Sequence, residues 1–341
     1  MLDTLKTLCA LPGVSGDEGC VRDHIVAEAR RCGAEVSVDV MGNVIAVKKG
    51  AAKPKKRLML AAHMDEVGVV CVGHTDDGYL KFACAGGIDR RLLPGKAVYF
   101  KSGAAGVIGF KAIHLTTSEE RQRVPKVDEL YIDIGADNKE AAQKLVRAGD
   151  TGSFSPVIRE LHGGLVRAKA IDDRAGCAVL LKLMREELPW DVTFCFTVQE
   201  EVGCRGARLL GYRLAPDAAL IVEGTTAADL PGVKGVKRIT SVGGGAVIPF
   251  MDRATIYDRE LFAVLSALAE KNGVKWQTKS YIAGGTDGSA IQRSRSGVKT
   301  AGIAVPVRNI HSPNCIASAE DLNAVFELAH LFAESWGELE V

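Results

Sequence analysis

The chain lacks the features that mark membrane, exported or nucleic-acid-binding proteins. No uninterrupted apolar stretch approaches the roughly 20 residues of a membrane-spanning helix. The first residues lack the basic-then-apolar layout of a signal peptide, so we expect neither a membrane partner nor export. The 43 basic residues face 42 acidic ones, for a net charge of +1, which argues against nucleic-acid binding through bulk charge.

Cysteine is present but not in a pattern that builds disulfides or zinc fingers. The nine cysteines are odd in number and scattered, and no CxxC pair occurs. Reduced thiols explain this distribution better than a disulfide framework. We therefore expect a cytoplasmic protein.

The remaining composition is that of a globular protein with ample length for one large core or two domains. The 341 residues are 47% hydrophobic and 25% charged. Disorder is excluded because it requires low hydrophobicity together with high net charge.

Short apolar runs that end in an acid or an imidazole dominate the middle and end of the chain. Five such runs precede a residue that can bind metal: Leu58–Ala62 before His63, Leu165–Ile171 before Asp172, Val192–Val198 before Glu200 and Glu201, Ala218–Val222 before Glu223, and Ala301–Val307 before His311. The sequence also predicts four helices and two early strands. The helices are expected at 2–12, 20–33, 175–187 and 204–211, and the strands at 35–40 and 43–48. We predict an α/β fold, a mixed sheet sandwiched by helices, with its ligands beyond the carboxyl ends of the strands.

Residues 69–160 follow a different pattern. They contain short strands separated by glycine and aspartate turns, and only Lys139–Leu145 looks helical. We expect a small β-rich domain inserted here, with residues 1–68 and 161–341 forming the catalytic domain.

The polar residues at the run ends form a set of two imidazoles and four carboxylates. Nitrogen and oxygen ligands without thiolates suit Zn²⁺, Co²⁺ or Mn²⁺. Six groups are too many for one tetrahedral ion, and they suit two ions that share a bridging carboxylate, with one carboxylate left as a base. Such a pair can turn a water into hydroxide near neutral pH, as amide hydrolysis requires. Asp65, two residues after His63 and on the same side of an extended chain, can hold that imidazole in one tautomer. Spacing alone does not decide whether Glu200 or Glu201 is the base.

Six motifs in a fixed order resemble one family of peptidases. They are HMDEVG (63–68), AIDDRAG (170–176), TVQEEVGCRGA (197–207), TTAADLPG (225–232), GGTDG (284–288) and RNIHSP (308–313). Each motif alone is weak, but the ordered set resembles the tetrahedral aminopeptidases, also called glutamyl or deblocking aminopeptidases (peptidase family forty-two).

This resemblance implies roles for individual residues. His63, Asp172 and Glu223 would hold one metal, and Asp172, Glu201 and His311 the other, with zinc as the first choice and cobalt or manganese as alternatives. Glu200 would act as general base toward a metal-bridging hydroxide that attacks short peptides at their N-terminal residue. A cis peptide bond would follow Asp172. One departure is visible, because Glu223 stands where the family usually has aspartate.

The resemblance also implies an assembly. Family members fold as an α/β catalytic domain with an inserted β-rich dimerisation domain, and their dimers commonly form a hollow dodecamer. The segment at 69–160 falls where this insertion should be, so we expect a homo-oligomer.

Several alternatives stay open from the sequence. A related dinuclear deacylase or carboxypeptidase would use the same ligands, whereas a metal-independent glycoside hydrolase (endoglucanase) would leave both histidines without a role. A non-catalytic assembly protein is the third alternative. Asp172 alone could be a helix N-cap, the glycine-rich stretch 283–288 could be a helix cap or a pocket wall, and Arg308 could contact substrate or form a structural ion pair.

Overall fold

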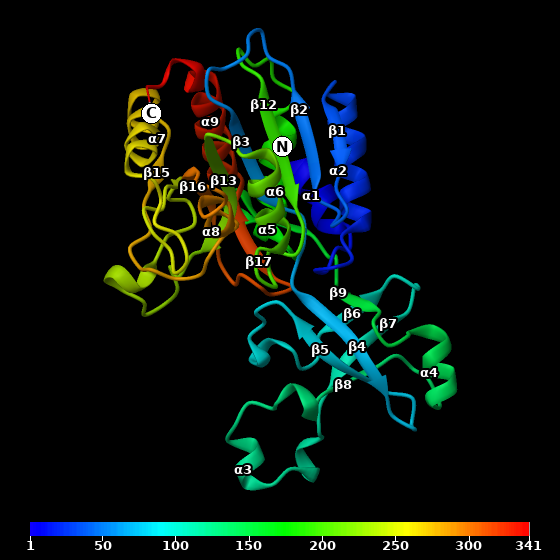
Figure 1. Cartoon of the computed structure of the whole chain (residues 1–341). Helices are drawn as coiled ribbons and strands as arrows, with labels where there is room; N and C mark the ends of the chain where they lie inside the picture. Colours follow the sequence, from blue (N-terminus) through cyan, green and yellow to red (C-terminus); the bar gives the residue numbers. More distant parts are fainter. Residues whose placement is uncertain (341) are drawn as a thin grey trace.

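The computed structural model describes residues 1–340, which are built around an eight-stranded mixed sheet (Figure 1). The strands lie in the order β1-β2-β12-β3-β13-β16-β14-β15. The four inner strands β12, β3, β13 and β16 are mutually parallel, whereas β2 and β14 run antiparallel to their inner neighbours. The strand bounds are β1 (Glu35–Val38), β2 (Val44–Lys48), β3 (Leu58–His63), β12 (Val192–Thr197), β13 (Ala218–Thr226), β14 (Ala246–Val247), β15 (Trp276–Gln277) and β16 (Lys299–Val307).

Helices cover both faces of this sheet, which confirms the predicted sandwich. Leu58 and Leu60 of β3 pack into the core beneath one layer of helices, whereas Met59 and Ala61 pack into the opposite core, as the two-residue period of a strand requires. The first layer contains α1 (Leu2–Ala10), α2 (Gly19–Arg31), α5 (Ile171–Leu183), α7 (Arg259–Asn272) and α9 (Ala319–Ser335). The second contains α6 (Arg205–Leu214) and α8 (Gly288–Gln292).

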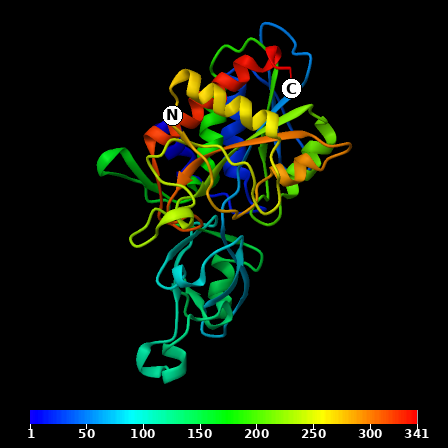
Figure 2. The same cartoon turned by 90° about the vertical axis from the view of Figure 1, so that its left-hand side faces the viewer.

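The chain forms a six-stranded closed barrel after β3, before it returns to the remaining strands of the main sheet. The β-rich pattern predicted this insertion. It lies below the sheet in both views (Figures 1 and 2) and has a hydrophobic core of its own. Its strands are β4 (Gly68–His74), β5 (Leu80–Ala85), β6 (Ala97–Phe100), β7 (Ala105–Gly109), β8 (Tyr131–Asp133) and β9 (Thr151–Phe154).

Two short helices belong to this inserted part. The predicted helix is α4 (Lys139–Leu145), but α3 (Ser118–Arg121) was not predicted. It lies in the excursion between β7 and β8, which projects away from the barrel (Figure 2). Thr117 and Glu120 form a capping box there, which stabilises one helical turn without an apolar face. Strand β9 was also missed, because TGSF carries no alternation of apolar residues.

One predicted strand belongs to another sheet than expected. The run ending before Asp172 forms β11 (Leu165–Ala168), which pairs antiparallel with β10 (Arg159–Leu161) and β17 (Cys315–Ser318) in a separate three-stranded sheet. Only Val166 and Ala168 of β11 are buried, so this strand has one apolar face and does not meet the requirement of an inner parallel strand. The chain still delivers Asp172 to the same end of the main sheet, through the first turn of α5. Within residues 1–340, no helix is long and apolar enough to cross a membrane.

Candidate metal centre

All six predicted imidazole and carboxylate side chains line one cavity of about 380 Å³ at the carboxyl end of the inner strands. His63 is the last residue of β3, and Asp172 lies in the first turn of α5. The remaining four come from the loop after β12, from β13, and from the loop between β16 and β17: Glu200, Glu201, Glu223 and His311.

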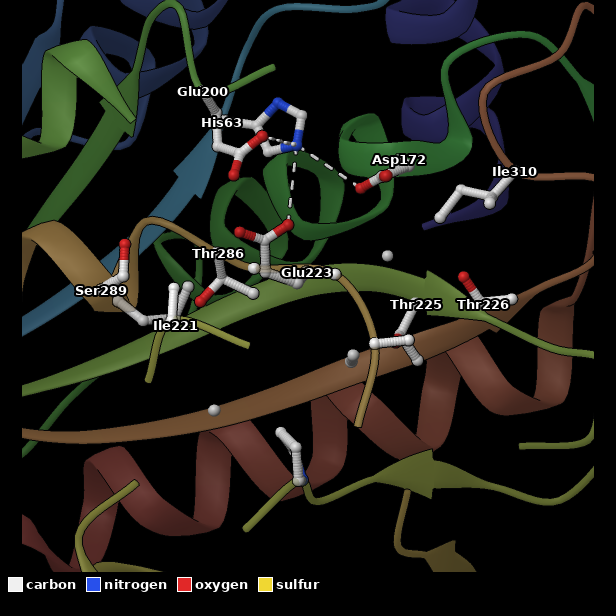
Figure 3. A pocket seen from close by; sticks show the side chains of 18 of the residues that line it. His63, Asp172, Glu200, Ile221, Glu223, Thr225, Thr226, Thr286, Ser289 and Ile310 are labelled. Carbon is white, nitrogen blue, oxygen red and sulfur yellow. Dashed lines mark ion pairs between the residues drawn. The ribbon is translucent and has the colours of Figure 1, made fainter. Parts of the chain in front are cut away.

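Asp172 lies between the two imidazoles. Its Oδ1 is 3.4 Å from His63 Nε2, and its Oδ2 is 3.3 Å from His311 Nε2. Each imidazole also faces a second carboxylate, with Glu223 Oε2 3.6 Å from His63 Nε2 and Glu201 Oε2 3.4 Å from His311 Nε2. Figure 3 shows Asp172, Glu223 and Glu200 converging on His63. The arrangement is therefore two histidine–carboxylate groups that share one aspartate.

The donor atoms of these two groups fit divalent cations. Asp172 Oδ1 and Glu223 Oε1 are buried and have no hydrogen-bond partner among the described residues. An unpaired carboxylate oxygen is costly to bury, and a bound cation would satisfy both atoms. All donors are nitrogen or oxygen, as zinc, cobalt and manganese sites accept.

Asp65 ties His63 to the glutamate loop. Its carbonyl oxygen lies 3.1 Å, and its carboxylate 3.4 Å, from His63 Nδ1. The same carboxylate accepts hydrogen bonds from the backbone N–H groups of Glu200 (2.9 Å) and Glu201 (3.2 Å) and from the Ser15 hydroxyl (2.6 Å). One fully buried side chain thus orients the imidazole and positions both glutamates.

The sequence predicted that Glu223 follows the end of a strand. In the structure it lies within the strand, because β13 continues to Thr226. The pairing between β13 and β3 stops at Ile221 opposite Ala61, whereas β13 stays paired with β16. Glu223 therefore lies where β3 has diverged, and its side chain enters the gap that this divergence opens.

Asp173 lies beside the centre but faces backbone donors. Its Oδ1 accepts a hydrogen bond from the N–H of Gly176, and its Oδ2 accepts one from the N–H of His63. Both of its oxygens are therefore occupied by backbone donors. The peptide bond between Asp172 and Asp173 is cis, as the resemblance implied.

The charges of the centre shift one another's protonation. Burial raises the pKa of Glu201 to about 7, and the Asp172 carboxylate adds to this shift. Burial also raises the pKa of Glu200, with contributions from Asp287 and Glu201. For His311, burial lowers the pKa, but the Asp172 and Glu201 carboxylates outweigh it and raise the pKa to about 9. The cavity thus holds an excess of negative charge that favours cations.

The inserted barrel reaches this centre. His311 Nδ1 lies 2.8 Å from the carbonyl oxygen of Gly87, which follows β5 of the barrel. This contact leaves His311 Nε2 facing Asp172 and Glu201. Sequence reasoning missed Gly87, because a backbone carbonyl 224 positions away leaves no pattern in the sequence.

Comparison with known proteins decides the family. The model of the M42 glutamyl aminopeptidase family matches residues 42–328. The chain belongs to the M42 glutamyl aminopeptidase family.

Relatives of this M42 chain match it over nearly its whole length. A putative aminopeptidase of Acetivibrio thermocellus is 38% identical, covering 96% of this chain and 97% of the relative. An aminopeptidase structure from the archaeon Desulfurococcus kamchatkensis is 34% identical, covers 98% and 95% of the two chains and superposes with a TM-score of 0.93. The TET1 peptidase of Pyrococcus horikoshii, described as assembling into a tetrahedron or a large octahedral shell, is 35% identical, covers 97% and 98%, and has a TM-score of 0.85.

The predicted resemblance and fold class are therefore confirmed, and the chain is an M42 metallo-aminopeptidase, a hydrolase of peptide bonds. The family implies a dinuclear metal site, for which the grouped histidine and carboxylate side chains are the candidates.

The M42 cavity also contains residues that the sequence analysis did not identify. Lys279 is buried in the cavity wall, where its Nζ donates a hydrogen bond to the Ala283 carbonyl (3.0 Å). Tyr257 lines the same wall, and its hydroxyl donates to Asp252 (2.9 Å). Both come from the segment between β14 and α8, which is distant in sequence from the ligands.

Two alternatives left open by the sequence are now settled by geometry. The glycine-rich stretch lines the cavity from Ala283 to Thr286, and Thr286 Oγ1 also accepts a hydrogen bond from the N–H of Gly288 at the start of α8. It is thus a pocket wall that leads directly into α8. Arg308 forms a two-pronged ion pair with Asp229 (2.7 and 2.5 Å) and does not line the cavity, so its role is structural.

Proposed function

We propose that the chain removes N-terminal residues from short peptides at this cavity. The observation that carries the proposal is Asp172, which turns one oxygen to His63 and the other to His311 while two further carboxylates flank the pair. This arrangement supports two cation sites with a shared aspartate, the first held by His63, Asp172 and Glu223 and the second by Asp172, Glu201 and His311.

The two adjacent glutamates take different roles in this proposal. Glu201 is the ligand, because its carboxylate lies 3.4 Å from His311. Glu200 is the general base, since it lines the same cavity but its carboxylate stays 4.0 Å from the imidazole it faces, that of His63. Its carboxylate accepts the proton of the attacking water and returns it to the leaving amine. When bound, two divalent cations polarise the substrate carbonyl and lower the pKa of that water.

Hydrolysis of aminoacyl anilides with free amino termini tests this function. Activity should disappear after chelation and return when Zn²⁺, Co²⁺ or Mn²⁺ is added, and elemental analysis should find two ions per chain. A panel of side chains would define the preferred N-terminal residue. Full activity after complete metal removal would overturn the proposal.

The same panel separates the alternatives. An N-acylated or carboxypeptidase substrate cleaved in place of the anilides would favour the related deacylase or carboxypeptidase. Chelator-resistant cleavage of a glucan would favour the endoglucanase, a mechanism that leaves His63 and His311 without a task.

We further propose that the chain is a homo-oligomer whose barrel mediates dimerisation, with dimers assembling into a dodecamer. The TET1 peptidase of Pyrococcus horikoshii supports the assembly, because its subunit superposes on this chain. A cytoplasmic location is proposed from the cysteines, all nine of which are free.

A further inference from the structure

A second hollow adjoins the metal centre on the side of α6 and α8. This groove has a volume of about 710 Å³ and lies between α6, α8 and the turn after α8. It shares Gly203, Cys204 and Ser289 with the cavity, so the two hollows are direct neighbours. Cys204 Sγ lies 3.4 Å from Glu200 Oε1, and Ser289 stands at the edge of the cavity in Figure 3. The groove therefore begins beside the proposed general base.

The groove is positively charged in a chain whose overall charge is balanced. Its charged lining residues are three exposed arginines: Arg208, Arg293 and Arg295. The two segments that carry them, 202–216 and 288–319, contain no acidic residue. Among residues 1–340, no carboxylate forms an ion pair with any of the three. Among the described residues, their charges are therefore not neutralised by direct ion pairs.

Backbone contacts hold two of these side chains in place. Arg293 Nε donates to the Ser289 carbonyl (2.7 Å), and Arg295 Nε donates to the Tyr212 carbonyl (2.5 Å). The Arg295 guanidinium also stacks over the Tyr212 ring, 4.5 Å from its centre. The terminal guanidinium nitrogens remain available to a ligand. Such planar forks suit carboxylates, which they bind through paired hydrogen bonds.

We infer that this groove binds the α-carboxylate of a short peptide whose amino terminus occupies the metal cavity. The inference rests on the proposed function, since it names the other end of the same substrate. It makes free short peptides, rather than chain ends of intact proteins, the preferred substrate class. The carboxylate of an acidic side chain near the peptide's carboxyl end could bind the same arginines. The experiment must therefore distinguish a side-chain carboxylate from the terminal α-carboxylate.

Matched peptides with and without a terminal charge test the inference. Peptides of two to five residues, each starting with the best residue from the anilide panel followed by glycines, are prepared as free acids and as C-terminal amides. We expect kcat/KM to be about five- to tenfold higher for the acid than for the amide at one preferred peptide length. Because the arginines are exposed, added salt should reduce this difference. A third series, amidated and with aspartate as its last residue, distinguishes side-chain carboxylates from the terminal one.

Substitutions locate the effect. In Arg208→Gln combined with Arg293→Gln, the preference for the acid should fall to within about twofold, mainly through KM. Arg213→Gln is the matched control, because Arg213 is an exposed arginine of the same helix that does not line the groove. Circular dichroism confirms that the variants are folded.

The outcomes are distinct from those of the proposed function. Anilide hydrolysis by the wild-type protein with equal rates on acid and amide peptides would overturn the inference and leave the proposed function intact. A preference that survives the double substitution, or that follows only the aspartate series, would also overturn it. A short oligonucleotide, added as a competitor, tests whether the arginines bind phosphates instead. If it inhibits peptide hydrolysis while the acid and amide peptides are cleaved at equal rates, the inference is also overturned.

Discussion

At the residue scale, the division of labour between the two adjacent glutamates is the sharpest consequence of the geometry. Glu200→Gln keeps the shape of the side chain but removes its capacity to accept a proton. We expect kcat on aminoacyl anilides to fall by about 10²- to 10⁴-fold, the usual contribution of a general base, while two metals stay bound. Rates with saturating metal, together with elemental analysis, check both parts.

Two variants control this experiment. Glu201→Gln should instead lower the bound metal toward one ion per chain, because Glu201 faces His311. Glu187→Gln, an exposed glutamate beyond the end of α5, should leave rate and metal content unchanged. If Glu200→Gln kept kcat within about threefold, the base would have to be sought elsewhere.

The residues of the centre could be proposed from sequence because each follows an apolar run and the side chains after these runs gather at one cavity. The inner strands supply most of them, whereas Asp172 follows β11 of the separate three-stranded sheet. His63 and Asp65 illustrate the rule, since their two-residue spacing predicts the contact that the structure contains. Gly87 and Lys279 could not be found in this way. The first acts through its backbone, and the second reaches the cavity from a segment whose position depends on the whole fold.

At the scale of elements, the approach of α5 to β13 depends on a glycine. A Cβ on Gly176 would lie 2.4 Å from the Val222 carbonyl oxygen and 2.5 Å from Asp173 Oδ2. Gly176→Ala should therefore push α5 from the sheet, destabilise the protein by about 1–3 kcal/mol as overpacking does, and weaken metal binding at the neighbouring Asp172 and Glu223. The melting temperature of the metal-free protein and a metal titration check the two effects.

Gly19→Ala provides the control for this substitution. Gly19 likewise lies in a helix, as the first residue of α2, but the nearest atom to its Cβ would be Arg22 Nη2 at 3.7 Å, an ordinary contact. Its replacement should be neutral or slightly stabilising. Equal melting temperatures for both variants would show that the close approach at Gly176 is relieved without cost.

The elements themselves were predictable where their periodicity was strong. The inner strands and α5 follow from continuous apolar runs and helical spacing. Strand β11 was assigned to the wrong sheet because an apolar run of four residues does not specify its partner. Pairing is a long-range property, and only the structure shows that β11 joins β10 and β17.

At the scale of the whole molecule, the pattern of short strands and turns at 69–160 separated the barrel from the sandwich, but it could not show how they meet. The contact between Gly87 and His311 means that the barrel helps to orient a candidate metal ligand. The two parts therefore meet at the centre, and we expect an assembly held by the barrel to act on the geometry of the centre as well.

The excursion between β7 and β8 identifies where such an assembly should form. It exposes Phe110 (51%), Ile113 (73%) and Leu115 (60%) within a few residues, and proteins normally cover apolar side chains gathered in this way. We expect light scattering after gel filtration to give the mass of a dimer or a dodecamer. The double variant Phe110→Asp with Ile113→Asp should shift the mass toward a smaller species, because buried carboxylates would oppose association.

Val40→Asp is the control for this last prediction, since Val40 is 99% exposed but lies in the turn between β1 and β2, far along the chain from the barrel. It should keep the mass of the wild type. Circular dichroism separates loss of assembly from loss of fold in the double variant. A wild-type monomer at micromolar concentration would refute the homo-oligomer. An unchanged assembly in the folded double variant would mean that the contact lies on another face of the barrel.

Because the barrel holds Gly87 against His311, the smaller species should also bind metal more weakly than the wild-type assembly. A metal titration of both species would measure this difference.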